Sequence, residues 1–363
     1  FFERQDVARR NTGRLVFLFV LAVLAIMVSI DLLLAATMGY LGRDPETGAI
    51  DWSVAADLQL VGIAVVGTLV VVGGGSLFKI AQLRGGGRVI AEELGGRRLN
   101  PDASLPTERQ LLNVVEEMAI ASGTPAPPVY LLDAEEGINA FAAGFTIDDA
   151  VIGVTRGAVE QLSREELQGV IAHEFSHILN GDMRLNIRLI GLLNGILIIG
   201  ILGYFMLRVT AFSGHRRSSR DGNSMPLMAL GAGLMVVGFF GTFFGNLIKA
   251  GVSRQREFLA DASAVQFTRQ PAGLSGALKR IGGFQSGSAV QSPNAPEASH
   301  MFFGRATSGL SGLFATHPPL AERIRTLEPS WNGQLAEGTP APATQPAAAG
   351  VAGLAGSEAK AVR

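Results

Sequence analysis

Four long stretches without Lys, Arg or Glu constrain this chain more than any other feature of its sequence. They lie at residues 15–36, 58–78, 189–207 and 226–248, and only the first contains a charged side chain, Asp31. A helix of about 20 apolar residues is long enough to cross the hydrocarbon core of a bilayer. Soluble cores rarely contain four such stretches, so the sequence predicts four membrane-spanning helices rather than four buried helices of a soluble protein. No secretory cleavage site follows the first stretch, and we interpret it as an anchor.

The composition narrows the function classes further. Only 17% of the 363 residues are charged and the net charge is −1, so no basic field is present that would attract nucleic acid. The sequence contains no cysteine, which excludes disulfides, thiolate catalysis and cysteine-bound zinc within it. A metal site in this chain has to use His, Asp or Glu. Nucleic-acid binders, disulfide scaffolds and disordered proteins are therefore excluded.

Basic residues beside the apolar stretches predict the orientation of the chain, because cytoplasmic loops carry an excess of Lys and Arg. Residues 1–14 contain four arginines and residues 79–98 contain five basic side chains, whereas residues 37–57 contain one Arg against four acidic side chains. We therefore predict a cytoplasmic N-terminus at 1–14 and a periplasmic loop at 37–57. The region that follows residue 78 is predicted to be cytoplasmic.

The loop at residues 208–225 conflicts with this rule. It contains four arginines and one Asp, yet two crossings by 189–207 and 226–248 would place it in the periplasm. A shallow hairpin that does not cross the membrane would remove the conflict. The two stretches are long enough to cross and carry no charged face, so we predict a periplasmic loop and keep the shallow hairpin as the alternative.

The remaining sequence predicts a cytoplasmic domain made of two parts, residues 79–188 and 249–328. Apolar runs at 127–132 and 150–154 indicate short strands. A tail at 329–363, rich in Ala, Pro and Gly, is predicted to be disordered. The predicted fold class is mainly α with a small β-sheet, as a four-span helical membrane protein that carries a cytoplasmic domain.

An HExxH motif at residues 173–177 is the strongest chemical signal in the sequence. A capping-box signature at 163–166 predicts that the motif lies inside a helix. His173 and His177 then share one helix face and reach one ion, with Glu174 beside it. Zinc lowers the pKa of a bound water molecule, and a neighbouring carboxylate takes the proton. The alternative is a helix with two surface histidines.

A catalytic zinc usually has three protein ligands, and the sequence offers two candidates for the third. Asp182 follows His177 by only five residues and would fold back only if the helix ended at residues 180–181. Glu257 is the better candidate, because it lies on a helix predicted after the fourth apolar stretch. Asp261 shares its face and would accept the ring N–H of a ligand histidine. The alternative is a solvated face of ion pairs along this helix.

Several motifs occur together in a characteristic order. They are the HExxH segment followed by NGD at 180–182, NAFAAG at 139–144, RQREFLAD at 254–261 and THPPLAER at 316–323. Over roughly residues 10–328, this pattern resembles the HtpX-like membrane zinc metallopeptidases, relatives of the type I CAAX prenyl endopeptidases. The loop at 282–312 and the tail look longer than in compact members of that family.

The resemblance implies a gluzincin-type peptidase of the bacterial inner membrane, with its site facing the cytoplasm and a role in membrane-protein quality control. It implies one zinc ion per chain, bound by three side chains and assisted by two more carboxylates. These are His173, His177 and Glu257 as ligands, Glu174 as the general base and Asp261 as a supporting residue.

The oxyanion that develops during peptide hydrolysis needs a hydrogen-bond donor. His300, His317 and Arg323 are the candidates, and Arg323 is favoured because it cannot lose its charge. His317 precedes two prolines, and pinning a turn is its alternative role. His300 follows a loop rich in Gly, Ser and Pro, and its alternative is a surface position.

The segment from Asn139 to Gly144 is expected to bind substrate. An extended edge beside a metal binds a peptide through main-chain hydrogen bonds that ignore side-chain identity. The residues assigned to this role are Asn139, Ala140, Phe141, Ala142 and Gly144. An ordinary turn between strands is the alternative.

Together these observations predict an integral membrane zinc endopeptidase with polypeptide substrates, damaged membrane proteins among them. The lipid bilayer is its other expected partner, nucleic acid is not expected, and the oligomeric state stays open. One rival is a transporter or channel with an ion site between its spans. The other is an inactive assembly protein with a structural zinc, which would have a closed fourth coordination position.

Overall fold

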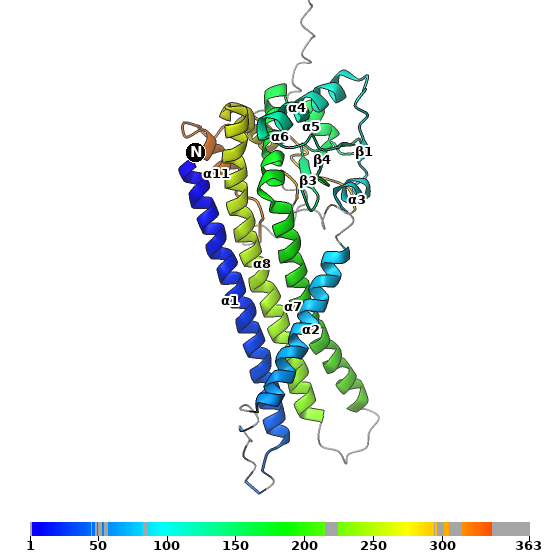
Figure 1. The fold of residues 1–363 in the computed structure, drawn as a ribbon, viewed down its shortest axis with the longest axis vertical. Coiled ribbons are helices and arrows are strands. Elements are labelled where there is room, and N and C mark those ends of the chain that lie inside the picture. The colour runs from blue at the N-terminus through cyan, green and yellow to red at the C-terminus, as the bar shows by residue number, and fades with distance from the viewer. Residues whose placement is uncertain are drawn as a thin grey trace, which may run out of the picture.

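The computed structural model describes residues 2–44, 57–82, 86–214, 224–293, 301–304 and 314–335, together with positions 46, 47, 49, 53 and 295. Four long helices form a bundle, and a compact domain lies at one end of it (Figure 1). The long helices are α1 (Phe2–Leu41), α2 (Leu58–Gln82), α7 (Asp182–Gly214) and α8 (Ser224–Thr268). Each contains one of the predicted apolar stretches, and each is long and apolar enough to cross a membrane.

The long helices approach one another closely at glycines. A Cβ atom on Gly195 of α7 would lie 2.2 Å from the carbonyl oxygen of Val72 in α2, and one on Gly203 would lie 2.4 Å from the backbone nitrogen of Met235 in α8. Only glycine fits at such positions, so the backbones of neighbouring helices touch. Gly191 and Gly195 of α7 both lie where this helix approaches α2 closely.

The α7–α8 hairpin extends along the whole bundle. The end of α7 and the start of α8 lie at the end of the bundle away from the domain, where α1 also ends and α2 begins (Figure 1). At the domain end, α8 continues well past its apolar stretch and into the domain. One continuous helix thus connects the bundle with the domain.

Four basic side chains mark one level of the bundle, where the long helices leave their apolar stretches on the side of the domain. We call this level the basic boundary, and its members are Arg14, Lys79, Arg188 and Lys249. Close to this level, neighbouring helices contact each other at three pairs of residues. The pairs are Leu15 with Gly251, Ile80 with Gly191, and Leu193 with Gly245. These contacts place the four charges at the same height along the bundle.

The domain is built on a four-stranded sheet in the order β1-β2-β4-β3, in which only the β2–β4 pair is parallel. The strands are β1 (Arg97–Arg98), β2 (Val129–Leu132), β3 (Ala140–Ala143) and β4 (Val151–Thr155). The helices of the domain are α3 (Gly86–Glu93), α4 (Pro106–Ser122), α5 (Arg156–Gln161), α6 (Arg164–Asn180), α9 (Pro271–Gly283) and α11 (Leu320–Leu327).

Alternation along the strands separates the two faces of the sheet. Val129, Leu131 and Ile152 belong to the main core with residues of α4, α6 and α9, whereas Tyr130 and Leu132 pack with residues of α3 on the other face. Successive side chains of a strand point to opposite faces, which explains this division. Mostly helical structure, a small sheet and four candidate spans confirm the predicted fold class.

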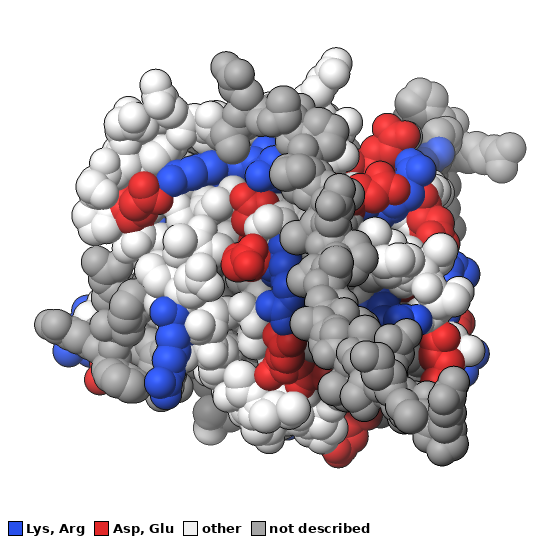
Figure 2. Space-filling view, turned by 90° about the horizontal axis from the view of Figure 1, so that it is seen from above, with Lys and Arg blue, Asp and Glu red and all other residues white. Residues whose placement is uncertain are grey.

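Charges of both signs cover the domain end of the molecule. Seen from above, Lys and Arg side chains lie interspersed with Asp and Glu over the described part of this face (Figure 2). Ion pairs such as those of Arg97 with Glu108 and Asp133 belong to this mixed surface. Neither sign of charge dominates it.

Local sequence signals position helix α6. The Ser163 side chain accepts a hydrogen bond from the Glu166 N–H, and the Glu166 carboxylate accepts one from the Ser163 N–H, which completes the predicted capping box. The helix ends at Asn180, because Gly181 adopts a left-handed conformation with φ of 67°. Helix α7 begins directly after this corner.

Candidate metal centre

Helices α6 and α8 bring His173, His177 and Glu257 together. The Nε2 atoms of the two histidines lie 3.0 Å apart. Glu257 Oε2 lies 3.7 Å from Nε2 of His173, and Glu257 Oε1 lies 3.5 Å from Nε2 of His177. Bonds of about 2.0–2.1 Å to a tetrahedral zinc ion would place its ligand atoms about 3.3 Å apart. The observed spacings bracket that value, so these three side chains fit a zinc ion between them.

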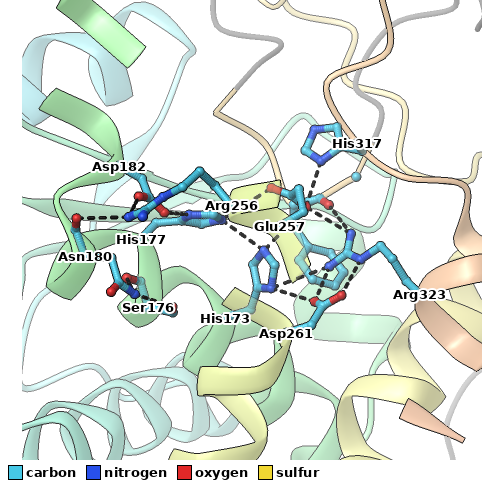
Figure 3. A network of polar contacts seen from close by, with 12 residues as sticks. His173, Ser176, His177, Asn180, Asp182, Arg256, Glu257, Asp261, His317 and Arg323 are labelled. Carbon is cyan, nitrogen blue, oxygen red and sulfur yellow. Dashed lines mark hydrogen bonds and ion pairs between the residues drawn. The ribbon is translucent and has the colours of Figure 1, made fainter. Parts of the chain in front are cut away.

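Each histidine is held from behind by a carboxylate. Nδ1 of His173 lies 2.9 Å from Oδ1 of Asp261, and Nδ1 of His177 lies 2.7 Å from Oδ2 of Asp182 (Figure 3). A proton shared on the Nδ1 side leaves the Nε2 lone pair available for a metal. The two rings therefore present their Nε2 atoms to one point.

The contact of Asp182 depends on the corner after α6. Asp182 was expected to fold back only if the helix ended at residues 180–181, and the helix ends there. Arg256 of α8 forms an ion pair with Asp182 and donates from Nη2 to the Asn180 carbonyl oxygen at 3.0 Å. Asp182 thus lies behind His177 and is tied to α8.

Arg323 lies behind the candidate ligands and is fully enclosed, with a relative exposure of 1%. Its guanidinium donates to both carboxylate oxygens of Asp261 at 2.9 and 2.7 Å, and Nη1 lies 3.3 Å from Oε2 of Glu257. It also donates to the carbonyl oxygen of Phe303 at 3.2 Å and stacks on that ring. In this structure the donors of Arg323 contact Asp261, Glu257 and Phe303, and its expected role as an oxyanion donor stays a prediction.

His317 lies beside Glu257 (Figure 3). Its Nδ1 atom is 2.9 Å from Oε2 of Glu257, and the side chain is largely buried. His317 and Arg323 thus both contact the same carboxylate oxygen of Glu257. His300 lies outside the residues that the structure describes.

Glu174 is completely buried next to the cluster. Its carboxylate oxygens make no hydrogen bond to another described side chain. Burial raises the pKa of Glu174 to about 8, against the opposing effect of the positive charges of His177 and Arg323. A carboxyl group with a raised pKa is suited to taking up and releasing a proton near neutral pH.

The two histidines have different electrostatic environments. Burial lowers the pKa of His173 to about 4, although the hydrogen bond with Asp261 acts in the opposite direction. Burial also disfavours protonation of His177, but its hydrogen bond to Glu257 and the nearby carboxylates outweigh that effect and raise its pKa. In this environment His173 is neutral at pH 7, as a metal ligand has to be.

Asn139 and Ala140, at the start of the segment expected to bind substrate, contact a distant part of the same chain. The side-chain amide of Asn139 donates to the carbonyl oxygens of Ser288 and Gly304, at 2.7 and 3.2 Å. The backbone N–H of Phe303 donates to the Ala140 carbonyl oxygen at 2.7 Å. Asn139 and Ala140 therefore hold a distant part of this chain in this structure, and their expected role in substrate binding stays a prediction.

The second half of the segment borders the candidate site. Phe141 points into the core, where its ring packs edge-on against Phe302 at 5.4 Å. Ala142 lines a pocket that also contains His177 and is closed by residues of α7, α8 and the segment at 301. Gly144 has φ of 147°, and a Cβ atom there would lie 2.8 Å from the Ala150 Cα atom. Ala142 is thus the member of the segment that reaches the candidate site.

Two contributions to the site were missing from the sequence-based set. Arg256 was included in the RQREFLAD motif and in the ion-pair face of its helix, but no contact with Asp182 was assigned to it. Phe303 packs edge-on against His173 with the ring centroids 4.9 Å apart. No local pattern marks Phe303, because it lies 130 positions after His173 in the sequence.

Comparison with known proteins agrees with this geometry. Residues 106–330 match the family described as Peptidase family M48. A protein named Protease HtpX homolog from Dictyoglomus thermophilum is 40% identical over 226 residues, which cover 61% of this chain and 70% of that protein. A protein of the same name from Bacteroides fragilis is 36% identical over 227 residues, covering 61% and 68%.

Among solved structures, the crystal structure of S. mikatae Ste24p is similar with a TM-score of 0.42 and 17% identity, covering 87% of this chain and 66% of that one. The family match extends over α4 to α11 and includes both histidines of the HExxH motif and Glu257. The chain therefore belongs to peptidase family M48, among its HtpX-like metalloproteases.

Proposed function

We propose that this membrane protein is a zinc-dependent endopeptidase in which His173, His177 and Glu257 bind one zinc ion. The observation that carries the proposal is the spacing of the three side chains, in which the two Nε2 atoms lie 3.0 Å apart and the Glu257 carboxylate oxygens lie 3.5 and 3.7 Å from them. Glu174 lies on the helix turn of the first ligand. Asp261 and Asp182 orient the two imidazole rings.

The chain's own groups account for the proton transfers of peptide hydrolysis. A zinc ion held here would polarise a peptide carbonyl group and lower the pKa of a water molecule. In its ionised form Glu174 takes the proton of the attacking water, and its raised pKa favours holding that proton until it passes to the leaving amine. His317, which lies beside Glu257, donates a hydrogen bond to the developing oxyanion.

A peptide substrate would lie along the part of β3 that begins at Ala142. The pocket beside this strand is lined by Ala142, His177 and Glu257, and by Met183 and Ile187 of α7. The polar side chains of Asp182, Asn186, Ser253 and Arg256 line the same pocket, which is therefore of mixed character. Main-chain hydrogen bonds along the strand would accept varied sequences, which suits an enzyme that clears damaged proteins.

The candidate site lies just outside the membrane in this proposal. Glu257 follows Lys249 of the basic boundary by eight residues, which is about 12 Å along a helix. The α7–α8 hairpin runs the full length of the bundle, which supports two crossings rather than a shallow hairpin. Basic side chains gathered on the domain side support a cytoplasmic catalytic domain, since cytoplasmic boundaries are rich in Lys and Arg.

We retain the predicted division of the chain, with spans at 15–36, 58–78, 189–207 and 226–248, and a catalytic domain formed by 79–188 and 249–328. A site close to the membrane surface has immediate access to membrane proteins. Quality control of such proteins in a bacterial inner membrane is the role that we propose for it.

Two other functions predict different metal environments. A transporter would place its ion site among the spans, whereas the cluster formed by His173, His177 and Glu257 lies on the domain side of the basic boundary. A structural zinc would have four protein ligands. The deciding experiment is a crystal structure of the metal-loaded protein, with the element identified at the zinc absorption edge. Three protein ligands and one position open to solvent would support the proposal, and a fourth protein ligand would overturn it.

A further inference from the structure

A groove on the bundle surface lies outside the candidate metal centre. It is formed by α8 and the segment at residues 314–316, which returns to α8 just before His317. The lining residues are Phe239, Thr242, Phe243, Asn246, Lys249, Ala250, Phe314 and Thr316. The groove combines one cation, uncharged polar side chains and three aromatic rings.

The far wall of this groove is fixed to α8 at two points. The rings of Phe243 and Phe314 pack edge-on with centroids 5.2 Å apart. Nη1 of Arg254 donates to the carbonyl oxygen of Ala315 at 2.8 Å. The wall is therefore held in place below and above the level of Lys249, which gives the groove a defined width.

Position along the bundle separates the groove into two zones. Lys249 belongs to the basic boundary, and Asn246 lies one turn of α8 below it. Phe239 and Phe243 lie further into the apolar stretch, and each has 46% of its surface exposed. The groove thus runs from the level of lipid headgroups down into the level of acyl chains.

The charge of Lys249 has no counterpart within the described part of the chain, where no carboxylate forms an ion pair with it. The side chain is partly buried in the groove wall. An ammonium group that loses part of its hydration without a partner is costly. Asn246 and Thr316 offer an amide and a hydroxyl group on the same groove.

We propose that this groove binds an anionic glycerophospholipid, with the lipid phosphate on Lys249 and an acyl chain along Phe239 and Phe243. The apolar lower zone favours a whole lipid over a free phosphate ion, which would use only the upper zone. Because Thr316 precedes His317, the bound lipid also supports the segment that carries His317 to Glu257. The inference rests on the proposed membrane level of Lys249 and does not require proteolysis.

Native mass spectrometry of the detergent-purified full chain tests the proposal. The protein is titrated with phosphatidylglycerol and, separately, with phosphatidylcholine of the same acyl chains. We expect one retained phosphatidylglycerol, and Lys249→Gln should weaken its binding about fivefold, the effect of about 1 kcal/mol for one cation near anionic lipid. Lys79→Gln is the matched control, because Lys79 belongs to the same boundary and hydrogen-bonds to Gln82 outside the groove. It should change the affinity less than twofold.

Further variants keep the test decisive if Lys249→Gln folds poorly. Lys249→Arg should retain binding, because it keeps the charge, and Asn246→Ala should weaken binding without removing a charge. Equal loss of lipid in the Lys79 and Lys249 variants would overturn the proposal, since it would indicate a general surface charge effect. Binding of glycerol 3-phosphate with the affinity of the whole lipid would also overturn it. Cleavage activity is not needed for any of these outcomes, so they are independent of the catalytic proposal.

Discussion

His177 and Asp182 face each other across the corner between α6 and α7, with Nδ1 and Oδ2 separated by 2.7 Å. This contact exists because Gly181 takes a left-handed conformation and turns the chain back after the last residue of α6. Arg256 holds the same carboxylate from α8. One acidic residue therefore connects the catalytic helix, the start of a membrane helix and the helix that carries Glu257.

Replacement of Asp182 by Asn should weaken zinc binding about 10- to 100-fold, because carboxylates that orient a ligand imidazole contribute that much to metal affinity. Zinc affinity is measured by competition with a chromophoric chelator. The control is Asp148→Asn, which changes an exposed acidic side chain elsewhere in the domain. Unchanged zinc affinity in Asp182→Asn would show that the contact with His177 does not support the metal.

Glu174→Gln should leave zinc bound and reduce proteolysis by a factor of about 10² to 10⁴, the usual contribution of a general base. The amide keeps the shape of the side chain but cannot take a proton from water. Zinc content is measured together with cleavage of an unfolded protein such as casein. Near-normal cleavage by this variant would remove Glu174 from the proposed role.

Glu257→Ala should reduce zinc affinity, because the substitution removes one of three proposed ligands while both histidines remain. Glu322→Ala provides the control, since Glu322 is an exposed carboxylate on α11. Metal stoichiometry after dialysis distinguishes the two variants. Full zinc occupancy and normal affinity in Glu257→Ala would assign this residue to the ion-pair face considered as its alternative.

Removal of the metal should destabilise the protein. A ligand present at 100 times its dissociation constant stabilises the folded state by about 2.7 kcal/mol. We therefore expect EDTA to lower the midpoint of thermal unfolding in detergent, and zinc added in excess to restore it. Magnesium is the control, because the His, His and Glu donors suit zinc far better. A melting curve that does not respond to EDTA would contradict a zinc ion bound at this site.

The loop at 208–225 is expected to lie in the periplasm, because the α7–α8 hairpin extends along the whole bundle. Residues 215–223 themselves lie outside the described part of the chain. A cysteine placed at Ser218 in this cysteine-free sequence should react with a membrane-impermeant thiol reagent on intact cells. Ser286→Cys, at an exposed position of the domain, should react only after the membrane is opened. The reverse pattern at Ser218 would favour the shallow hairpin.

Several parts of the structure follow from short-range sequence signals. Uncharged stretches of about 20 residues predicted the four long helices, and the capping box at Ser163 predicted where α6 begins. The spacing of His173 and His177 predicted a shared helix face, because an α-helix repeats every 3.6 residues. Glu257 was selected from its own helix and from the family motif, and its role as a ligand stays a prediction. Each of these signals lies within a few turns of a single helix, so it can be read from neighbouring residues.

Other features depend on contacts between segments far apart in the sequence. Arg323 was favoured as an oxyanion donor because of its permanent charge, yet that same charge is satisfied by Asp261 and Glu257 behind the site. Asn139 was expected at the substrate edge, but its amide holds Ser288 and Gly304. Residue type alone does not reveal whether a donor is already used within the fold.

The sequence by itself determined which segments are apolar enough to enter a membrane, which helix carries the metal-binding pattern and to which kind of enzyme that pattern belongs. These properties depend on composition and helical periodicity, which are local. Only the tertiary structure decided that Asp182 contacts His177, that Arg323 lies behind the three proposed metal ligands and that Lys249 faces a groove. Each of these depends on how α6, α7, α8 and α11 pack together. The role of a side chain therefore depends on which groups the neighbouring helices place beside it.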